Sequence, residues 1–138
     1  MRASRILAPE AAKSDDAGDY YEWSALLRSV SAFEIYRKVY RDLITPRRVA
    51  ELLILREAMP RSLRHCMSRV QQTLVRVANL HSAETQRRAG EIHATLQYGR
   101  IEDALEEGLR NYLSGFLERT SDLGARIARD FLVSEATA

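Results

Sequence analysis

The sequence of residues 101–131 reads IEDALEEGLRNYLSGFLERTSDLGARIARDF. Its apolar side chains recur at helical spacing and form one long stripe: Leu105, Leu109, Tyr112, Phe116, Leu123, Ile127 and Phe131. Acidic residues fill its first turns and arginines its last turns, which suits the helix dipole. We therefore predict one long helix. The glycines within it, Gly108, Gly115 and Gly124, indicate either close packing against a neighbouring helix or a bend.

Four shorter helices are predicted upstream of this stretch. The first covers residues 19–42 and carries an aromatic-rich apolar stripe. The second begins at Thr45 and the third at Pro60, because threonine caps helices and proline suits the first helical position. The fourth runs from a cap at Ser82 to Tyr98. No segment alternates with period two, so the sequence predicts an all-α fold, an antiparallel bundle of about five helices.

The length of 138 residues fits a single domain, which we place at residues 19–133 between tails at 1–18 and 134–138. A hydrophobic fraction of 46% and a charged fraction of 29% are typical of globular proteins. The sequence has neither a transmembrane stretch nor an apolar N-terminal leader, so we expect a cytoplasmic protein without a membrane partner. The net charge of +2 is too small to demand a nucleic-acid partner.

Catalytic and cofactor motifs are missing from the sequence. It contains no Glu-x-x-His pair for a di-iron site, no His-Glu-x-x-His, no phosphate-binding glycine loop and no Gly-x-Ser-x-Gly elbow. The single cysteine, Cys66, excludes an internal disulfide, and its neighbour His65 points about 100° away on a helix. We expect Cys66 to pack half-buried. We also expect no metal, no cofactor and no catalytic activity in this chain itself.

Arginines at helix starts are the most unusual charge pattern. Arg47 and Arg48 fall in the first turn of the second helix, and Arg61 and Arg64 fall at the start of the third. A cation there opposes the helix dipole by about 0.3–1 kcal/mol. With Arg41 from the end of the first helix, these side chains and the helix-start amides are predicted to bind an anion or an acidic partner. Salt bridging within the bundle is the alternative.

The first predicted helix contains a carboxylate beside several aromatic residues. Glu34 lies at the edge of the apolar stripe, which makes it a candidate buried polar group paired with an arginine. An exposed pair with Lys38 and a catalytic role are the alternatives. Trp23, Tyr36 and Tyr40 lie on the stripe itself. Such residues pack in cores or form interfaces, and we expect this helix to provide a contact surface.

Several sequence blocks resemble the bacterial alpha-E domain family. They are DYYEWSALLRSVSAFEIY at residues 19–36, ITPRRVAELL at 44–53, PRS at 60–62, and the pairs Gly108-Leu109, Phe116-Leu117 and Leu123-Gly124. The resemblance spans residues 19–133. This stretch resembles only the C-terminal part of the family members, which are longer. We place the family's Glu-Arg motif in the N-terminal part of those longer members. Glu118-Arg119 resembles this motif only locally, and we do not assign the motif to it. A chain that lacks the N-terminal part would expose apolar faces, which implies self-association, a partner, or an orphaned fragment.

The resemblance also implies a functional context. Alpha-E domains are fused to, or encoded beside, circularly permuted ATP-grasp proteins, often together with transglutaminase-like proteins. ATP-grasp enzymes form amide bonds through acyl phosphates. The resemblance thus implies a non-catalytic accessory or interaction domain that serves an ATP-grasp amide ligase in peptide synthesis or modification.

Two other functions remain open from the sequence. The short second helix and the arginine-rich third helix mimic a helix-turn-helix, which indicates a small nucleic-acid-binding module. A steep dependence of duplex-DNA binding on salt would support that function. An enzyme acting through Glu34 and nearby arginines would need a pocket that holds these side chains together.

Overall fold

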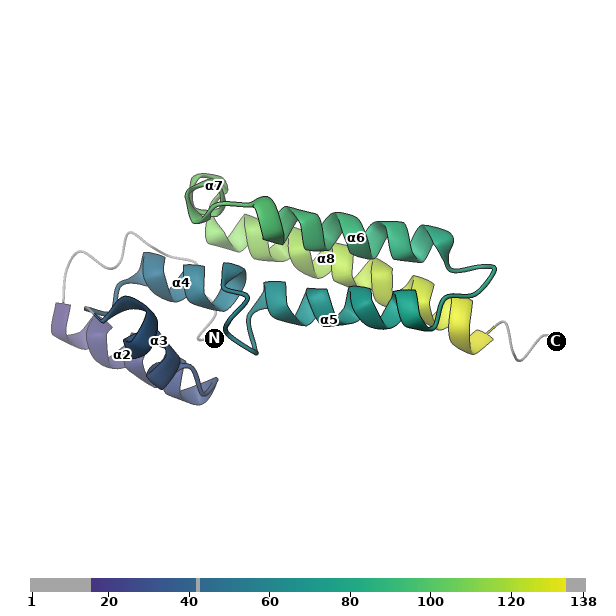
Figure 1. Ribbon diagram of the computed structural model, residues 1–138. Helices are drawn as coiled ribbons and strands as arrows, with labels where there is room; N and C mark the ends of the chain where they lie inside the picture. Colours follow the sequence, from purple (N-terminus) through teal and green to yellow (C-terminus); the bar gives the residue numbers. More distant parts are fainter. Residues whose placement is uncertain (1–15, 42, 134–138) are drawn as a thin grey trace.

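The computed structural model describes residues 16–41 and 43–133, and they form helices joined by turns and loops (Figure 1). The elements are α2 (Asp16–Ser29), α3 (Phe33–Tyr40), α4 (Pro46–Leu55), α5 (Leu63–Arg76), α6 (Ala83–Tyr98), α7 (Ile101–Glu107), α8 (Leu109–Ala128) and the π-helical turn η2 (Arg129–Val133). The prediction of an all-α fold is confirmed. Within these ranges no helix combines the length and the apolar character needed to cross a membrane.

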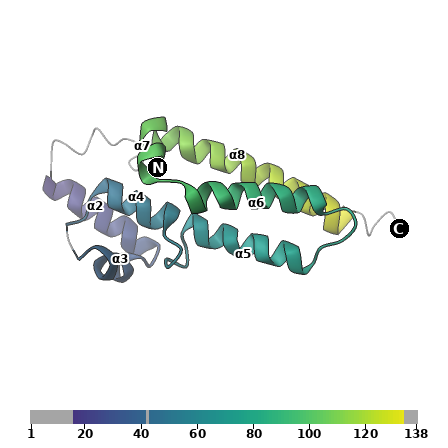
Figure 2. The same cartoon turned by 45° about the horizontal axis from the view of Figure 1, so that its top comes forward.

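The molecule is elongated, with the bundle of α5, α6 and α8, here called the long bundle, at one end and α2, α3 and α4 at the other (Figures 1 and 2). Helices α5, α6 and α8 lie side by side, and α6 runs antiparallel to the other two. Helices α2, α3 and α4 form the smaller group, while α7 lies beside α4. The predicted antiparallel bundle therefore describes α5, α6 and α8.

Two apolar clusters share helix α4. Its residues Val49 and Leu52 pack with Trp23, Leu27 and Tyr36 of the smaller group. On the opposite side of the same helix, Ala50 and Ile54 pack into the cluster of the long bundle. Burial of a large apolar side chain contributes about 1.5–3 kcal/mol. Helix α4 thus joins the two halves of the molecule by burying both of its faces.

The single helix predicted over residues 19–42 is wrong, because the chain turns between Ser29 and Phe33. Ser31 adopts a left-handed conformation with φ 58°, and the amide of Ala32 donates to the carbonyl of Leu27 at 2.7 Å. These features form a Schellman motif, which usually has glycine at the left-handed position. The turn brings Tyr36 of α3 onto α4. Its hydroxyl accepts from the amide of Thr45 at 3.1 Å and donates to the Leu43 carbonyl at 2.9 Å.

The long C-terminal helix is also divided, at Gly108. This glycine has φ 92° and separates α7 from α8, so the bend that we considered is present here. The other two glycines lie inside α8 and do not mark close packing. A Cβ at Gly115 would meet Arg119 only at 3.8 Å, and one at Gly124 would meet no atom within 4 Å.

The predicted start of the second helix is confirmed, whereas that of the third is shifted. Thr45 accepts a hydrogen bond from the amide of Arg48 at 3.3 Å and caps α4. Pro60, however, precedes the cap of α5. Ser62 is that cap, and its hydroxyl accepts from the amide of His65 at 3.0 Å. A serine three residues before a free amide supplies an acceptor that proline lacks.

Ser82 precedes α6 as expected, but its side chain does not cap the helix. The hydroxyl instead accepts from the backbone amide of Asn79 at 2.9 Å and donates to the carbonyl of the same residue at 3.1 Å. The buried Ser82 therefore closes the loop between α5 and α6, and the predicted cap is wrong.

We predict opposite effects for alanine at two glycines of the C-terminal region. Gly108→Ala places a side chain at φ 92° and should lower the free energy of unfolding by about 1–3 kcal/mol. Gly124→Ala, in the open helix interior, should raise it by about 0.5–1 kcal/mol. Urea denaturation followed by circular dichroism measures both. Equal effects of the two substitutions would contradict the assignment of the bend.

Candidate functional site

A shallow, open groove lies between α6 and α8, with a volume of about 600 Å³. Ile92 and Ala94 supply its apolar part, and Ile92 is buried at 4% exposure. The polar lining consists of Arg88, Glu91 and Thr95 from α6, and of Glu118, Arg119 and Asp122 from α8. Apart from Thr95, these side chains are charged, and both signs are present. The two antiparallel helices hold these charged side chains on facing surfaces.

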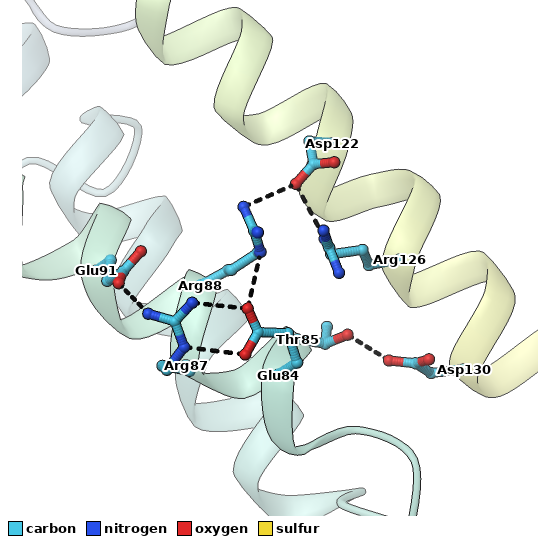
Figure 3. A network of polar contacts seen from close by, with 8 residues as sticks. All are labelled: Glu84, Thr85, Arg87, Arg88, Glu91, Asp122, Arg126 and Asp130. Atoms are coloured by element: carbon cyan, nitrogen blue, oxygen red, sulfur yellow. Dashed lines mark hydrogen bonds and ion pairs between the residues drawn. The ribbon is translucent and has the colours of Figure 1, made fainter.

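A chain of ion pairs runs from the surface of α6 across to α8 (Figure 3). Arg87 contacts both Glu84 and Glu91 on its own helix. Arg88 also contacts Glu84, with its Nε 3.1 Å from a carboxylate oxygen, and reaches Asp122 of α8 at 3.5 Å. Exposed pairs of this kind contribute little to stability, because water and salt screen their charges. Their main effect is therefore to hold Arg88 in position over the groove.

The charges of this network alter the ionisation of its members. Hydrogen bonds from Arg87 lower the pKa of Glu84 to about 2, and the charge of Arg87 and the contacts of Arg88 act in the same direction. The hydrogen bond with Glu84 likewise holds the pKa of Arg87 above its usual value. Glu84 and Arg87 therefore remain charged near neutral pH, and Glu84 provides a stable negative partner for Arg88 of the groove.

A buried polar contact fastens the end of the same helix pair. The Thr85 hydroxyl, 1% exposed, donates to the carboxylate of Asp130, 8% exposed (Figure 3). The side-chain amide of Asn79 donates to the Asp130 carbonyl at 3.1 Å. Three segments, the α5–α6 loop, α6 and η2, therefore meet at Asp130. A buried carboxylate requires such donors to offset the loss of water.

Three of the five arginines predicted to bind an anion or a partner contact side chains within the molecule. Arg47 forms an ion pair with Glu102 of α7, and Arg64 forms one with Glu57 at 3.1 Å. Arg48 lies with its guanidinium 5.5 Å from the centre of the Tyr40 ring. The alternative of salt bridging inside the molecule thus applies to Arg47 and Arg64. The Nε atom of Arg64 is buried and has no hydrogen-bond partner.

The structure does not gather the five arginines into one pocket. Arg41 is exposed at the end of α3, where it takes a left-handed conformation with φ 52°. Arg61 is exposed just before α5. The length of α4, about 15 Å for its ten residues, separates Arg47 at one end of this helix from Arg61 beyond the other. Binding of an anion or an acidic partner by these arginines stays a prediction.

The expectation of a buried Glu34 is wrong, because this side chain is exposed on α3 and is not part of the groove. The alternative of catalysis through Glu34 therefore loses the pocket that it requires. Trp23 and Tyr36, expected at an interface, are 7% and 0% exposed and belong to the core of the smaller group. Cys66, expected to be half-buried, is exposed.

Tyr40, the third expected interface residue, connects α3 to α4. Its hydroxyl donates to Glu51 at 2.6 Å, and Glu51 also lies 3.6 Å from Arg56. Burial raises the pKa of Tyr40 to about 12, with a further contribution from the hydrogen bond to Glu51. The half-buried Tyr40 is therefore used inside the molecule as a structural contact.

The arrangement of α4 and α5 departs from a helix-turn-helix. Such motifs join two crossing helices by a turn of about three or four residues. Residues 56–62 separate α4 from α5, and the two helices follow one another along the length of the molecule (Figures 1 and 2). The geometry therefore does not favour the nucleic-acid-binding alternative.

The sequence analysis missed the groove, although a signal for it exists. Glu84 and Arg88 are four residues apart, as are Asp122 and Arg126, and such spacing places opposite charges on one helix face. Two faces of this kind on α6 and α8 mark surfaces that remain in contact with water. Their juxtaposition across the groove, however, depends on tertiary packing.

Residues 1–132 match the Alpha-E model, which is described as a predicted alpha-helical domain with a conserved ER motif. The chain belongs to the Alpha-E family. None of the curated proteins and none of the solved structures is detectably similar to it.

The family description does not place its ER motif on particular residues of this Alpha-E chain. Glu118-Arg119, which resembles that motif locally, lies on α8 and lines the groove. Among the described residues, no three His, Cys, Asp or Glu side chains are grouped closely enough to hold a metal ion. The groove is therefore the candidate site that the structure adds to the family assignment.

We predict that Thr85→Val destabilises the fold. Valine keeps the shape of the side chain but removes the hydroxyl that donates to the buried Asp130 carboxylate, which should cost about 1–3 kcal/mol of unfolding free energy. Thr95→Val is the matched control, since the Thr95 hydroxyl only donates to a carbonyl of its own exposed helix face. Urea denaturation compares the two variants. An equal loss in both would contradict a special role for the buried contact.

The ion pairs of Glu84 predict a pH-dependent contribution to stability. The folded-state pKa of about 2 lies below the ordinary glutamate pKa of 4.5, so the contribution is present above about pH 5 and is lost as pH falls towards 2. The difference in unfolding free energy between the wild type and Glu84→Gln should close over this range. Added salt should reduce the difference at neutral pH. A difference that persists at pH 2 would contradict the ion-pair origin.

Proposed function

We propose that this Alpha-E chain is a non-catalytic helical interaction domain that serves a circularly permuted ATP-grasp amide ligase in peptide synthesis or modification. The groove between α6 and α8 is the observation that carries this proposal. It is open, its lining is more apolar than polar, and it carries charges of both signs. Protein interfaces combine these features, with apolar contact at the centre and charges at the rim.

Two displaced pKa values, one beside the groove and one elsewhere in the molecule, also support binding rather than catalysis. The displaced pKa of Glu84 arises from ion pairs with arginines on the same helix, and that of Tyr40 arises from burial and a hydrogen bond to Glu51. Both groups are held in the charge state that they have at neutral pH in water. A general acid or base needs a pKa near the operating pH instead.

Arg119 is the groove residue best placed to contact a partner. It is exposed, and no carboxylate pairs with it within the described ranges, whereas Arg88 is held by Glu84 and Asp122. An acidic side chain of the partner would therefore find Arg119 available without breaking a contact of the bundle. A charge-assisted hydrogen bond of this kind adds both affinity and a fixed orientation.

The resemblance to domains that accompany ATP-grasp proteins supplies the partner class. Amide formation through an acyl phosphate competes with hydrolysis, so exclusion of water from that intermediate favours the product. A rigid helical domain docked beside the ligase can shield the intermediate or hold the acceptor amine. Because the ligase consumes ATP, the proposed site of action is the cytoplasm.

Co-purification with the neighbouring ATP-grasp protein tests the proposal. Arg119→Glu should reduce the amount of ligase recovered with the tagged chain about tenfold, because reversal of one contacting charge typically costs more than 1 kcal/mol. Arg110→Glu, an exposed arginine on the same helix but outside the groove, is the matched control. Undiminished recovery with Arg119→Glu, or no recovery of a ligase by the wild type, would overturn the proposal.

The arginines predicted from the sequence enter the same experiment as a second variant. Arg41 and Arg61 are exposed and lie outside the groove, so the double variant Arg41→Glu/Arg61→Glu leaves the groove intact. If these arginines also contact the ligase, this variant lowers recovery as well. Unchanged recovery restricts the interface to the groove.

A further inference from the structure

Apolar side chains are strongly exposed at the end of the long bundle that lies farthest from α2, α3 and α4. Leu80, in the loop between α5 and α6, is 98% exposed, and Leu132 of η2 is 71% exposed. Val75 and Val77, at the end of α5, are 61% and 49% exposed. Single exposed apolar residues are common on proteins, but a group of them at one end indicates a contact surface. We call these four residues the apolar tip.

The two segments that form the apolar tip are held together. The side-chain amide of Asn79, next to Leu80, donates to the backbone carbonyl of Asp130 in η2 at 3.1 Å. The carboxylate of Asp130 in turn accepts from Thr85 of α6. Both views show the α5–α6 loop and η2 at the same end of the molecule (Figures 1 and 2). These hydrogen bonds therefore fix the segments that carry the exposed Leu80 and Leu132.

The charges next to the apolar tip are positive. Arg76 is the last residue of α5 and Arg129 is the first of η2, and both are exposed. Neither forms an ion pair within the part of the chain that the structure describes. Among the described residues, two acids near this end are already engaged, because Asp130 is buried against Thr85 and Glu84 is bound by Arg87 and Arg88. The end of the bundle thus combines exposed apolar groups with two available cations.

We infer that the apolar tip, with Arg76 and Arg129, binds the surface of an anionic lipid bilayer. The tip is the protruding end of a helical bundle, not a groove, so it offers no channel for a partner helix. A bilayer interface accommodates a protruding leucine, which enters the boundary between headgroups and acyl chains. Arginines beside it reach the lipid phosphates with their long side chains.

This binding needs no membrane span and is compatible with the absence of a spanning helix among the described residues. It departs from the sequence-based expectation of no membrane partner, which rested on the lack of a transmembrane stretch. Each arginine near an anionic surface strengthens binding about fivefold, and insertion of the apolar side chains adds to this effect. The expected association is weak, reversible and reduced by salt.

Vesicle sedimentation with the full chain tests the inference. The wild type should sediment with vesicles of phosphatidylcholine and phosphatidylserine and should remain in solution with phosphatidylcholine alone. Arg76→Gln/Arg129→Gln should weaken binding to the anionic vesicles about 25-fold, as the product of two fivefold effects. Leu80→Asp should also abolish most of the binding, because it places a carboxylate at the inserted position.

Two matched controls distinguish the apolar tip from general surface effects. Leu117→Asp replaces a leucine that is 63% exposed on α8 outside the tip, and Arg69→Gln/Arg110→Gln removes two exposed arginines elsewhere on the bundle. Both controls should bind anionic vesicles within twofold of the wild type, where about 0.4 kcal/mol corresponds to twofold.

Three outcomes would overturn the inference. These are no binding of the wild type to anionic vesicles, equal binding to neutral vesicles, and equal losses in the control variants. Sedimentation equilibrium without lipid tests the competing possibility that a second copy of the chain binds the apolar tip. A dimer that Leu80→Asp dissociates, together with no vesicle binding, would assign the apolar tip to self-association instead. The substitutions lie outside the groove, so this result and that of the ligase experiment are independent.

Discussion

Burial of both faces of α4 is the constraint on which the rest of the structure depends. Val49 and Leu52 pack into the smaller helical group, while Ala50 and Ile54 pack into the long bundle. A helix of ten residues reaches this position because Thr45 caps it and Tyr36 anchors the preceding loop. Helices shorter than about 12–15 residues are marginal on their own in water, so α4 owes its stability to these two clusters. The clusters in turn owe their connection to α4.

The groove follows from the antiparallel arrangement of α6 and α8. Each helix turns an apolar stripe towards the bundle and leaves a charged face in water. Where the two charged faces meet, Arg88 and Asp122 form a contact between the helices, and Glu84 fixes Arg88 from its own helix. The result is a surface that combines an apolar area with ordered charges. In the proposed function, this surface is where the chain contacts the ligase.

Sequence reasoning succeeded where local physics decides the outcome. The spacing of apolar residues predicted the helices, and Thr45 with its proline predicted the start of α4. It failed at Ser31, where a residue other than glycine takes a left-handed conformation because the packing of α3 on α4 requires the turn. Gly108 carried a visible signal, but three glycines in one stripe were equivalent until the packing showed where the chain bends.

The sequence by itself determined the fold class, the bounds of α4 and α6, and the family, because periodicity, helix-start residues and sequence blocks are local properties of the chain. Only the tertiary structure decided which charges meet. Arg47 pairs with Glu102, and Thr85 with Asp130, across 55 and 45 residues of sequence. No local pattern encodes such contacts, because they depend on which amphipathic helices pack against each other and on how each helix is rotated about its axis. The groove and the apolar tip are consequences of this packing.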